Sequence, residues 1–151
     1  MTGGAERDVA VKQAIYEALA ETGRAPDSRE VAETTGLPEP DVLAAFDWLH
    51  RQRLLVPEPG VPSRIRMAPP FSGVPTTFRV RARDRSYFGN CVWDALGIPA
   101  ALHADAVVDA SDGLTGEPVS FTVGRDGPRP TRLIAHFAVP AARWWDDIIH
   151  T

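Results

Sequence analysis

The 151-residue sequence contains a single cysteine, Cys91. One cysteine cannot form a disulfide within the chain, which agrees with a reducing compartment and leaves the thiol available for chemistry. It also excludes a structural zinc site of the usual kind, because such sites combine several cysteine and histidine ligands. The four histidines are scattered without ligand spacing. Any thiol chemistry of this chain therefore centres on Cys91.

The sequence also lacks a long hydrophobic run and an excess of basic residues. No stretch approaches the roughly 20 apolar residues that span a bilayer, and residues 1–7 have no apolar signal core. The formal net charge is -4, whereas affinity for nucleic acid depends largely on neutralising phosphate charge. We expect a cytoplasmic protein with no membrane partner, and nucleic acid is not expected as a partner.

The first half of the chain predicts three helices and a hairpin. Apolar residues recur at helical spacing over 9–22, Asp27 and Glu30 form a capping-box pattern before a second short helix, and a third begins at residues 38–40. The third helix has an apolar stripe of Val42, Leu43, Phe46, Leu49 and Leu54. Residues 54–56 and 64–67 flank a turn and predict a β-hairpin. This order is typical of a winged-helix-like module, which we assign to residues 1–68.

A proline-rich segment, 68–75, separates this module from the second half, which we assign as one domain over residues 69–151. The pattern predicts an α+β domain with a small mixed or antiparallel sheet. Its expected strands are 76–82, 106–110, 118–123 and 131–139, with a helix after residue 90 and a final helix over 141–149.

The most informative pattern is Cys91 followed three residues later by Asp94. Residues 87–99 read as a loop, then a short helix that begins at Asn90 and stops at Gly97 and Pro99. Free amides and the positive dipole end of a first helical turn favour thiolate, so we expect a low pKa for Cys91. Spacing of three puts both side chains on one helix face. A soft nucleophile or metal ligand then lies beside a carboxyl that can carry a proton.

Each of these residues also has a structural interpretation. A lone cysteine is most often a small buried hydrophobe, and an aspartate early in a helix commonly interacts with the dipole. His136 lies within the expected strand 131–139, where a histidine usually satisfies a local hydrogen bond, although it can also act as a ligand or acid–base group.

Residues 87–123 resemble the alkylmercury (organomercurial) lyases, most clearly in Ile98-Pro99-Ala100 and in residues 115–123. His136-Phe137 and Trp144 are similar as well. In that family a cysteine followed three residues on by an aspartate belongs to the catalytic centre, and Cys91 and Asp94 fall on those positions. The family has a second active-site cysteine shortly before its His-Phe pair, whereas residues 131–136 contain no sulfur. The resemblance covers the C-terminal half, and the N-terminal half agrees in general layout.

The resemblance implies an enzyme that cleaves a carbon–mercury bond by protonolysis, with no organic cofactor. Cys91 would bind mercury transiently as a soft metal, Asp94 would protonate the carbon, and His136 would contribute to binding the small-molecule substrate. Cellular thiols would then remove the mercury. Because the second cysteine is missing, weak or altered cleavage is expected.

Two alternatives remain open from the sequence. The first is a thiol-dependent enzyme of specialised metabolism, or a soft-metal carrier, on the same fold. The second is a winged-helix DNA-binding regulator with a sensor domain for thiophilic ligands. Acidic residues outnumber basic ones through Met67, and Glu39 and Asp41 open the third helix, which disfavours DNA binding.

Overall fold

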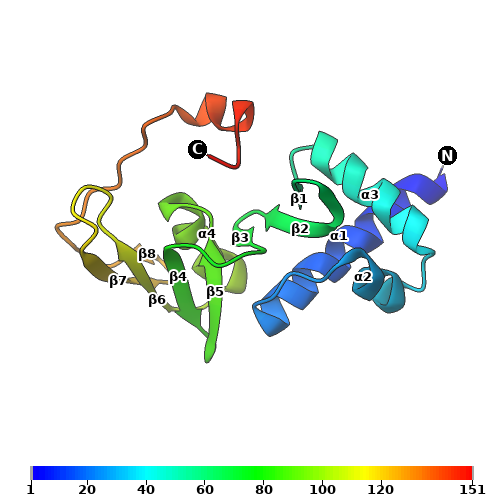
Figure 1. Cartoon of the computed structure of the whole chain (residues 1–151). Coiled ribbons are helices and arrows are strands. Elements are labelled where there is room, and N and C mark those ends of the chain that lie inside the picture. The colour runs from blue at the N-terminus through cyan, green and yellow to red at the C-terminus, as the bar shows by residue number, and fades with distance from the viewer. Residues whose placement is uncertain (1, 151) are drawn as a thin grey trace.

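Three helices open the chain and are followed by a small antiparallel sheet (Figure 1). The computed structural model describes residues 2–150. The helices are α1 (Thr2–Thr22), α2 (Ser28–Thr35) and α3 (Glu39–Arg51). The sheet has the order β1-β2-β3, formed by β1 (Val56–Glu58), β2 (Val61–Ala68) and β3 (Phe71–Ser72). This arrangement fits the winged-helix-like layout that the sequence predicts.

Local signals fix the ends of these helices. The Asp27 carboxylate accepts a hydrogen bond from Glu30 N at 2.9 Å, and Asp27 N donates to Glu30 Oε2 at 2.8 Å, so the predicted capping box is present. Gly36 ends α2 in the left-handed conformation, with φ 71°. Helix α1 starts seven residues before the predicted Val9, because the apolar spacing marks only the part of the helix that packs on the core. Leu54 lies beyond α3, in the turn before β1.

The second sheet is wholly antiparallel, with the strand order β5-β4-β6-β7-β8. Its strands are β4 (Phe78–Ala82), β5 (Arg85–Gly89), β6 (Ala106–Ser111), β7 (Pro118–Gly124) and β8 (Gly127–Pro128). Helix α4 (Val92–Leu102) connects β5 to β6 and buries Ala95, Ile98 and Leu102. The α+β class and the antiparallel sheet are therefore confirmed.

The two sheets and α1 share one core. Tyr87 of β5 is fully buried, and its hydroxyl donates to the Ala20 carbonyl of α1 at 2.8 Å. Its ring lies 5.8 Å from that of Phe71 in β3. Strand β3 lies just past the predicted boundary yet pairs with β2. The division into units 1–68 and 69–151 stays a prediction.

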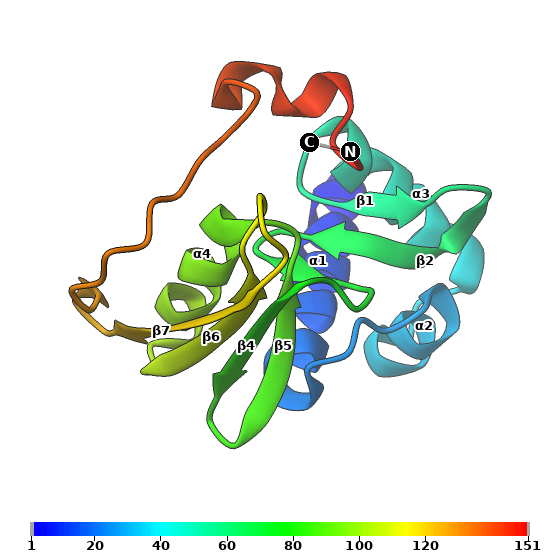
Figure 2. The same cartoon turned by 60° about the vertical axis from the view of Figure 1, so that its left-hand side comes forward.

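After β8 the chain runs apart from the sheet and returns to the N-terminal half (Figure 2). We call residues 129–150 the C-terminal arm. It ends in a 3₁₀ helix, η1 (Ala141–Asp146), and Arg53 lies 5.9 Å from the centre of the Trp145 ring. The arm thus links the far edge of the second sheet to the end of α3. No helix within residues 2–150 has the length and apolar character needed to cross a membrane.

Four sequence predictions about elements are wrong. Residues 87–89 belong to β5, not to a loop, because they pair with β4. Helix α4 continues through Pro99, which is buried together with Ile98, so packing outweighs the lost backbone hydrogen bond. Residues 131–139 form no strand, since Pro128 and Pro130 lack the N–H groups needed to extend pairing along β7. The final helix is a six-residue 3₁₀ helix instead of an α-helix over 141–149.

Candidate active site

Cys91 lies at the junction between β5 and α4, where it is the N-cap residue of the helix. Its backbone is extended, with φ -148° and ψ -176°, so it precedes the first turn instead of lying within it. The junction is tightly packed at Gly89. A Cβ atom on Gly89 would lie 2.8 Å from Ala95 N and 3.2 Å from the Asp94 Cβ atom. Only a glycine lets the end of β5 approach the first turn of α4 this closely.

The structure brings Cys91 and Asp94 together as the spacing predicts. The Sγ atom of Cys91 lies 3.9 Å from Oδ2 of Asp94. The same oxygen accepts hydrogen bonds from Asn90 N at 3.3 Å and from Asn90 Nδ2 at 3.0 Å. Asn90 therefore holds the carboxyl over the start of α4, on the side of the sulfur.

The predicted low pKa of the Cys91 thiol is wrong for this structure. Burial raises the pKa of Cys91, and the negative charge of Asp94 raises it further. Hydrogen bonding from the backbone at Asp94 and Trp93 favours the thiolate, as expected at a helix start, but burial outweighs it. The resting group is a neutral thiol beside a carboxyl.

Burial also raises the pKa of the Asp94 carboxyl above its ordinary value, despite the hydrogen bonds from Asn90 and the contact with Cys91. A carboxyl with a raised pKa accepts and keeps a proton more readily than an exposed one. Asp94 is thus a better proton acceptor than an exposed aspartate.

Tyr16 of α1 lies behind this pair and was not expected from the sequence. Burial raises the pKa of its phenol to about 12, and the charge of Asp94 contributes. The hydroxyl donates to the Pro69 carbonyl at 2.8 Å. Tyr16 therefore remains neutral and ties α1 to the segment between β2 and β3, beside the site.

Cys91, Asn90 and Asp94 open into a cavity of about 560 Å³, which we call the Cys91 cavity. The C-terminal arm forms its outer wall with Phe137, Trp144 and Trp145. The Trp144 ring lies 6.4 Å from that of Trp93 and 5.5 Å from that of Phe137, and its indole N–H donates to the Val139 carbonyl. This wall is aromatic and covers part of the approach to the thiol, which is half-buried.

Met67 of β2 also lines the Cys91 cavity. Met67 is buried, and its thioether is a soft sulfur donor, as the thiol of Cys91 is. Nothing in the local sequence marks Met67, because β2 reaches the site only through the fold.

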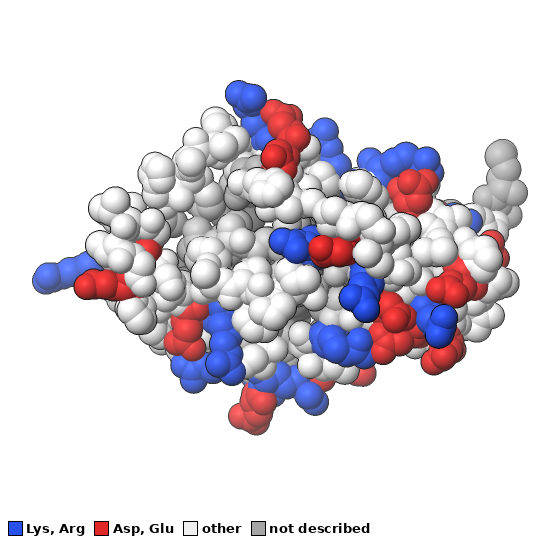
Figure 3. Space-filling view, viewed as in Figure 1, with Lys and Arg blue, Asp and Glu red and all other residues white. Residues whose placement is uncertain are grey.

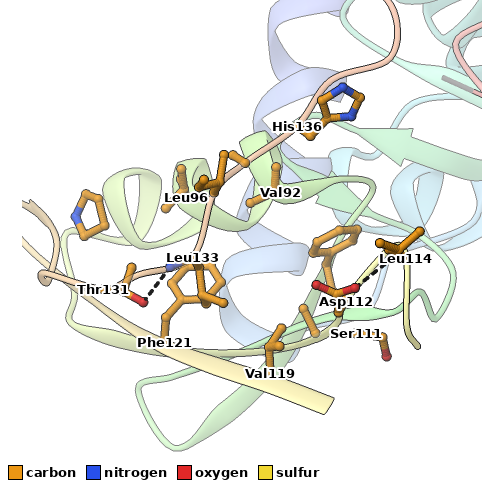
Figure 4. Close-up of a pocket in the computed structure, with 16 residues that line it drawn as sticks. Val92, Leu96, Ser111, Asp112, Leu114, Val119, Phe121, Thr131, Leu133 and His136 are labelled. Carbon is orange, nitrogen blue, oxygen red and sulfur yellow. Dashed lines mark hydrogen bonds between the residues drawn. The ribbon is translucent and has the colours of Figure 1, made fainter. Parts of the chain in front are cut away.

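His136 lies on the C-terminal arm and is exposed, outside any strand. It lines the Cys91 cavity and also a second cavity of about 660 Å³ (Figure 4). The second cavity lies between α4, the loop after β6, β7 and the arm. The structure thus places His136 at the border of both cavities.

Among residues 2–150, no group of three or more histidine, cysteine, aspartate or glutamate side chains is arranged to hold a metal ion.

A thiol and a raised-pKa carboxyl thus lie together at the start of α4, beside the aromatic residues of the arm. The family model for alkylmercury lyase (MerB) matches residues 71–151, more than half of the chain. The chain belongs to the alkylmercury lyase family.

The fold is also found in a solved structure, the crystal structure of the mercury-bound form of MerB2. That protein is 23% identical to this chain, with a TM-score of 0.57. The match covers 82% of this chain and 68% of the other. No curated protein sequence matches this chain.

Proposed function

We propose that this protein cleaves carbon–mercury bonds by protonolysis, with Cys91 as the mercury-binding thiol and Asp94 as the proton carrier. The observation that carries the proposal is the 3.9 Å separation of Cys91 Sγ and Asp94 Oδ2 inside the region that matches the family. The family match favours this activity over the metal carrier and the DNA-binding regulator. A cytoplasmic location agrees with the need for reduced thiols.

Capture of the substrate begins with an organomercurial carried by a cellular thiol. Cys91 gives its proton to the Asp94 carboxylate, its sulfur bonds to mercury, and the cellular thiolate leaves. Bonding of mercury to sulfur displaces the thiol proton, and the raised pKa of Asp94 makes its carboxylate a better acceptor for that proton than an exposed carboxylate. Mercury is a soft cation and prefers thiolate over oxygen ligands.

Cleavage then uses the stored proton. The electron pair of the carbon–mercury bond stays with carbon, which takes the proton from Asp94 and leaves as a hydrocarbon. A cellular thiolate bonds to the sulfur-bound mercury before the carbon leaves. Afterwards a second cellular thiol releases the mercury as a dithiolate, and its proton restores Cys91. Mercury remains divalent throughout, and no organic cofactor is needed.

The absent second cysteine affects the rate of cleavage. A second thiolate on mercury raises electron density at the attached carbon and makes it more basic. Residues 131–136 supply no sulfur, while the thioether of Met67 and the imidazole of His136 line the same cavity. We propose that a cellular thiol provides the second sulfur, so cleavage is weak and depends on thiol concentration.

The test is to incubate the purified protein with phenylmercury and excess thiol and to measure benzene. We expect release above the thiol-only background, rising with thiol concentration and absent in Cys91→Ser. Cys91→Ser removes the only thiol of the chain, so it has no competing reaction with mercury. Benzene release equal in the wild type, Cys91→Ser and the thiol-only control would remove the proposal.

A further inference from the structure

The second cavity of about 660 Å³ is not needed for the thiol and proton chemistry, since it does not include Cys91 or Asp94. We propose that it holds the organic group of the substrate bound at Cys91, so that the protein prefers bulky apolar organic groups over methyl. This inference rests on the proposed function for its substrate class.

The two cavities are adjacent. Phe78, Val92 and His136 line both of them. Val92 follows Cys91 directly in the chain, so the second cavity begins one residue from the reactive sulfur. The second cavity is therefore the apolar hollow next to the sulfur into which an organic group on a Cys91-bound mercury atom would extend.

The lining of the second cavity selects an uncharged, apolar group. Leu96 of α4, Phe121 of β7 and Leu133 of the arm are among the residues that line it (Figure 4). Figure 3 shows a hollowed and mostly uncharged surface between the arm and the rest of the molecule. Apolar walls of this kind recognise ligands by burial of hydrocarbon surface.

The carboxylate of Asp112 is engaged by its own loop. One of its oxygens accepts hydrogen bonds from Leu114 N at 2.9 Å, Thr115 N at 2.8 Å and the Thr115 hydroxyl at 3.2 Å. These bonds lower the pKa of Asp112, so it stays ionised and disfavours an anionic ligand. A neutral hydrocarbon group fits these surroundings.

Two large apolar side chains on the cavity wall are almost fully exposed: Leu114 at 94% and Ile134 at 90%. Exposed apolar walls around a hollow are a feature of ligand sites. A volume of about 660 Å³ lies within the range of small-molecule sites, roughly 300–1,000 Å³. A methyl group leaves such a space empty, whereas each methylene buried there tightens binding by up to about fourfold.

The first test uses a reaction that does not involve mercury. N-methyl, N-butyl and N-hexylmaleimide are added to the full-length protein, and the rate of Cys91 alkylation is compared with that of a small free thiol. We expect the hexyl compound to react about tenfold or more faster than the methyl compound at Cys91, after correction for the free thiol. A rate independent of chain length overturns the proposal.

Leu114→Lys and Ile134→Lys place a charge on either wall and should reduce this hexyl-to-methyl ratio toward one. Both residues are exposed, so the substitutions do not disturb the core. The matched control is Val9→Lys, an apolar residue of α1 that is 65% exposed and lies outside the cavity. An equal fall of the ratio in Val9→Lys would contradict a role for the cavity.

The second test repeats the comparison with methylmercury, hexylmercury and phenylmercury, each as its thiol adduct, and detects the Cys91 adduct by intact mass spectrometry. Preference for hexyl over methyl in both series, and for phenyl over methyl among the mercurials, supports the cavity and the substrate class. A length preference with maleimides but no mercury adduct removes the proposed function and leaves the apolar site. Mercury capture with no length preference in either series removes the apolar site alone, and no reaction of Cys91 in either series removes both.

Discussion

Asp94 Oδ2 accepts two hydrogen bonds from Asn90 and lies 3.9 Å from the sulfur of Cys91. One oxygen is therefore both anchored and adjacent to the thiol. Burial raises the pKa of both groups, so the pair holds a proton that a water-exposed pair would lose more easily. This arrangement is suited to a reaction in which the same proton first leaves sulfur and then reaches carbon.

Asp94→Asn should separate capture from cleavage. The amide keeps an oxygen that can accept from Asn90, but it cannot deliver a proton. We expect hydrocarbon release to fall by about 10² to 10⁴, the usual contribution of a general acid, while Cys91 still forms a mercury adduct. Single-turnover hydrocarbon release and intact mass spectrometry measure the two steps.

The matched control for this substitution is Asp109→Asn, which changes a carboxylate of β6 that pairs with Arg81 at 2.8 Å, away from the site. Its hydrocarbon release should equal that of the wild type. Release by Asp94→Asn at more than a tenth of the wild-type rate would contradict the role of Asp94.

The reactivity of Cys91 should depend on pH in a way that reports its surroundings. Because burial raises the pKa of the thiol above its ordinary value of 9.0, alkylation by iodoacetamide should have its midpoint above pH 9.0. Asp94→Asn removes the nearby negative charge and should shift the midpoint to lower pH. A wild-type midpoint below 9.0 would show instead that the helix start controls the thiol.

Asp94 should reduce the stability of the folded protein near neutral pH. Its pKa is raised on folding, so the folded state binds the proton more tightly, and stability falls as pH rises from the unfolded pKa through the folded one. Asp94→Asn should therefore raise Tm at pH 7, with the gain vanishing near and below the ordinary pKa of 3.8. Thermal unfolding at several pH values checks this, and a Tm at pH 7 below that of the wild type would contradict it.

The features predicted correctly from the sequence depend on residues close together in the chain. The Asp27–Glu30 capping box lies within four residues, and Cys91 and Asp94 meet because Asp94 follows three positions after the N-cap residue of α4. The positions of these residues in the sequence are enough to predict such local contacts.

The features that the sequence did not reveal depend on distant contacts. Tyr16 and Met67 reach the site through α1 and β2, and the pKa of Cys91 is controlled by burial that only the assembled fold creates. His136 lies in an apolar run that resembles a strand, but strand formation requires a free sheet edge. The prolines at residues 128 and 130 limit pairing at that edge to β8.

Gly89→Ala should impair the site more than it impairs folding. The new Cβ atom would lie 2.8 Å from Ala95 N, so β5 and the first turn of α4 must separate, which moves Asp94 relative to Cys91. We expect hydrocarbon release to fall at least tenfold, because a shift of about 1 Å can cost about a hundredfold in rate.

The control for this substitution is Gly4→Ala in α1, where a Cβ atom would meet nothing within 4 Å. Hydrocarbon release by this variant should equal that of the wild type, and its Tm should not fall. Equal hydrocarbon release by the wild type and Gly89→Ala would show that the junction tolerates displacement.

Trp144→Ala should open the Cys91 cavity. Trp144 contacts both Trp93 and Phe137, and these rings hold the C-terminal arm against the start of α4. Without the indole the arm loses its main apolar contact at this point, so local opening becomes more frequent. We expect faster alkylation of Cys91 and faster proteolysis within residues 130–140, detected by mass spectrometry. Trp48→Ala, which removes a tryptophan of α3 that is 38% exposed, should change neither rate. Unchanged alkylation in Trp144→Ala would mean that the arm does not limit access to the thiol.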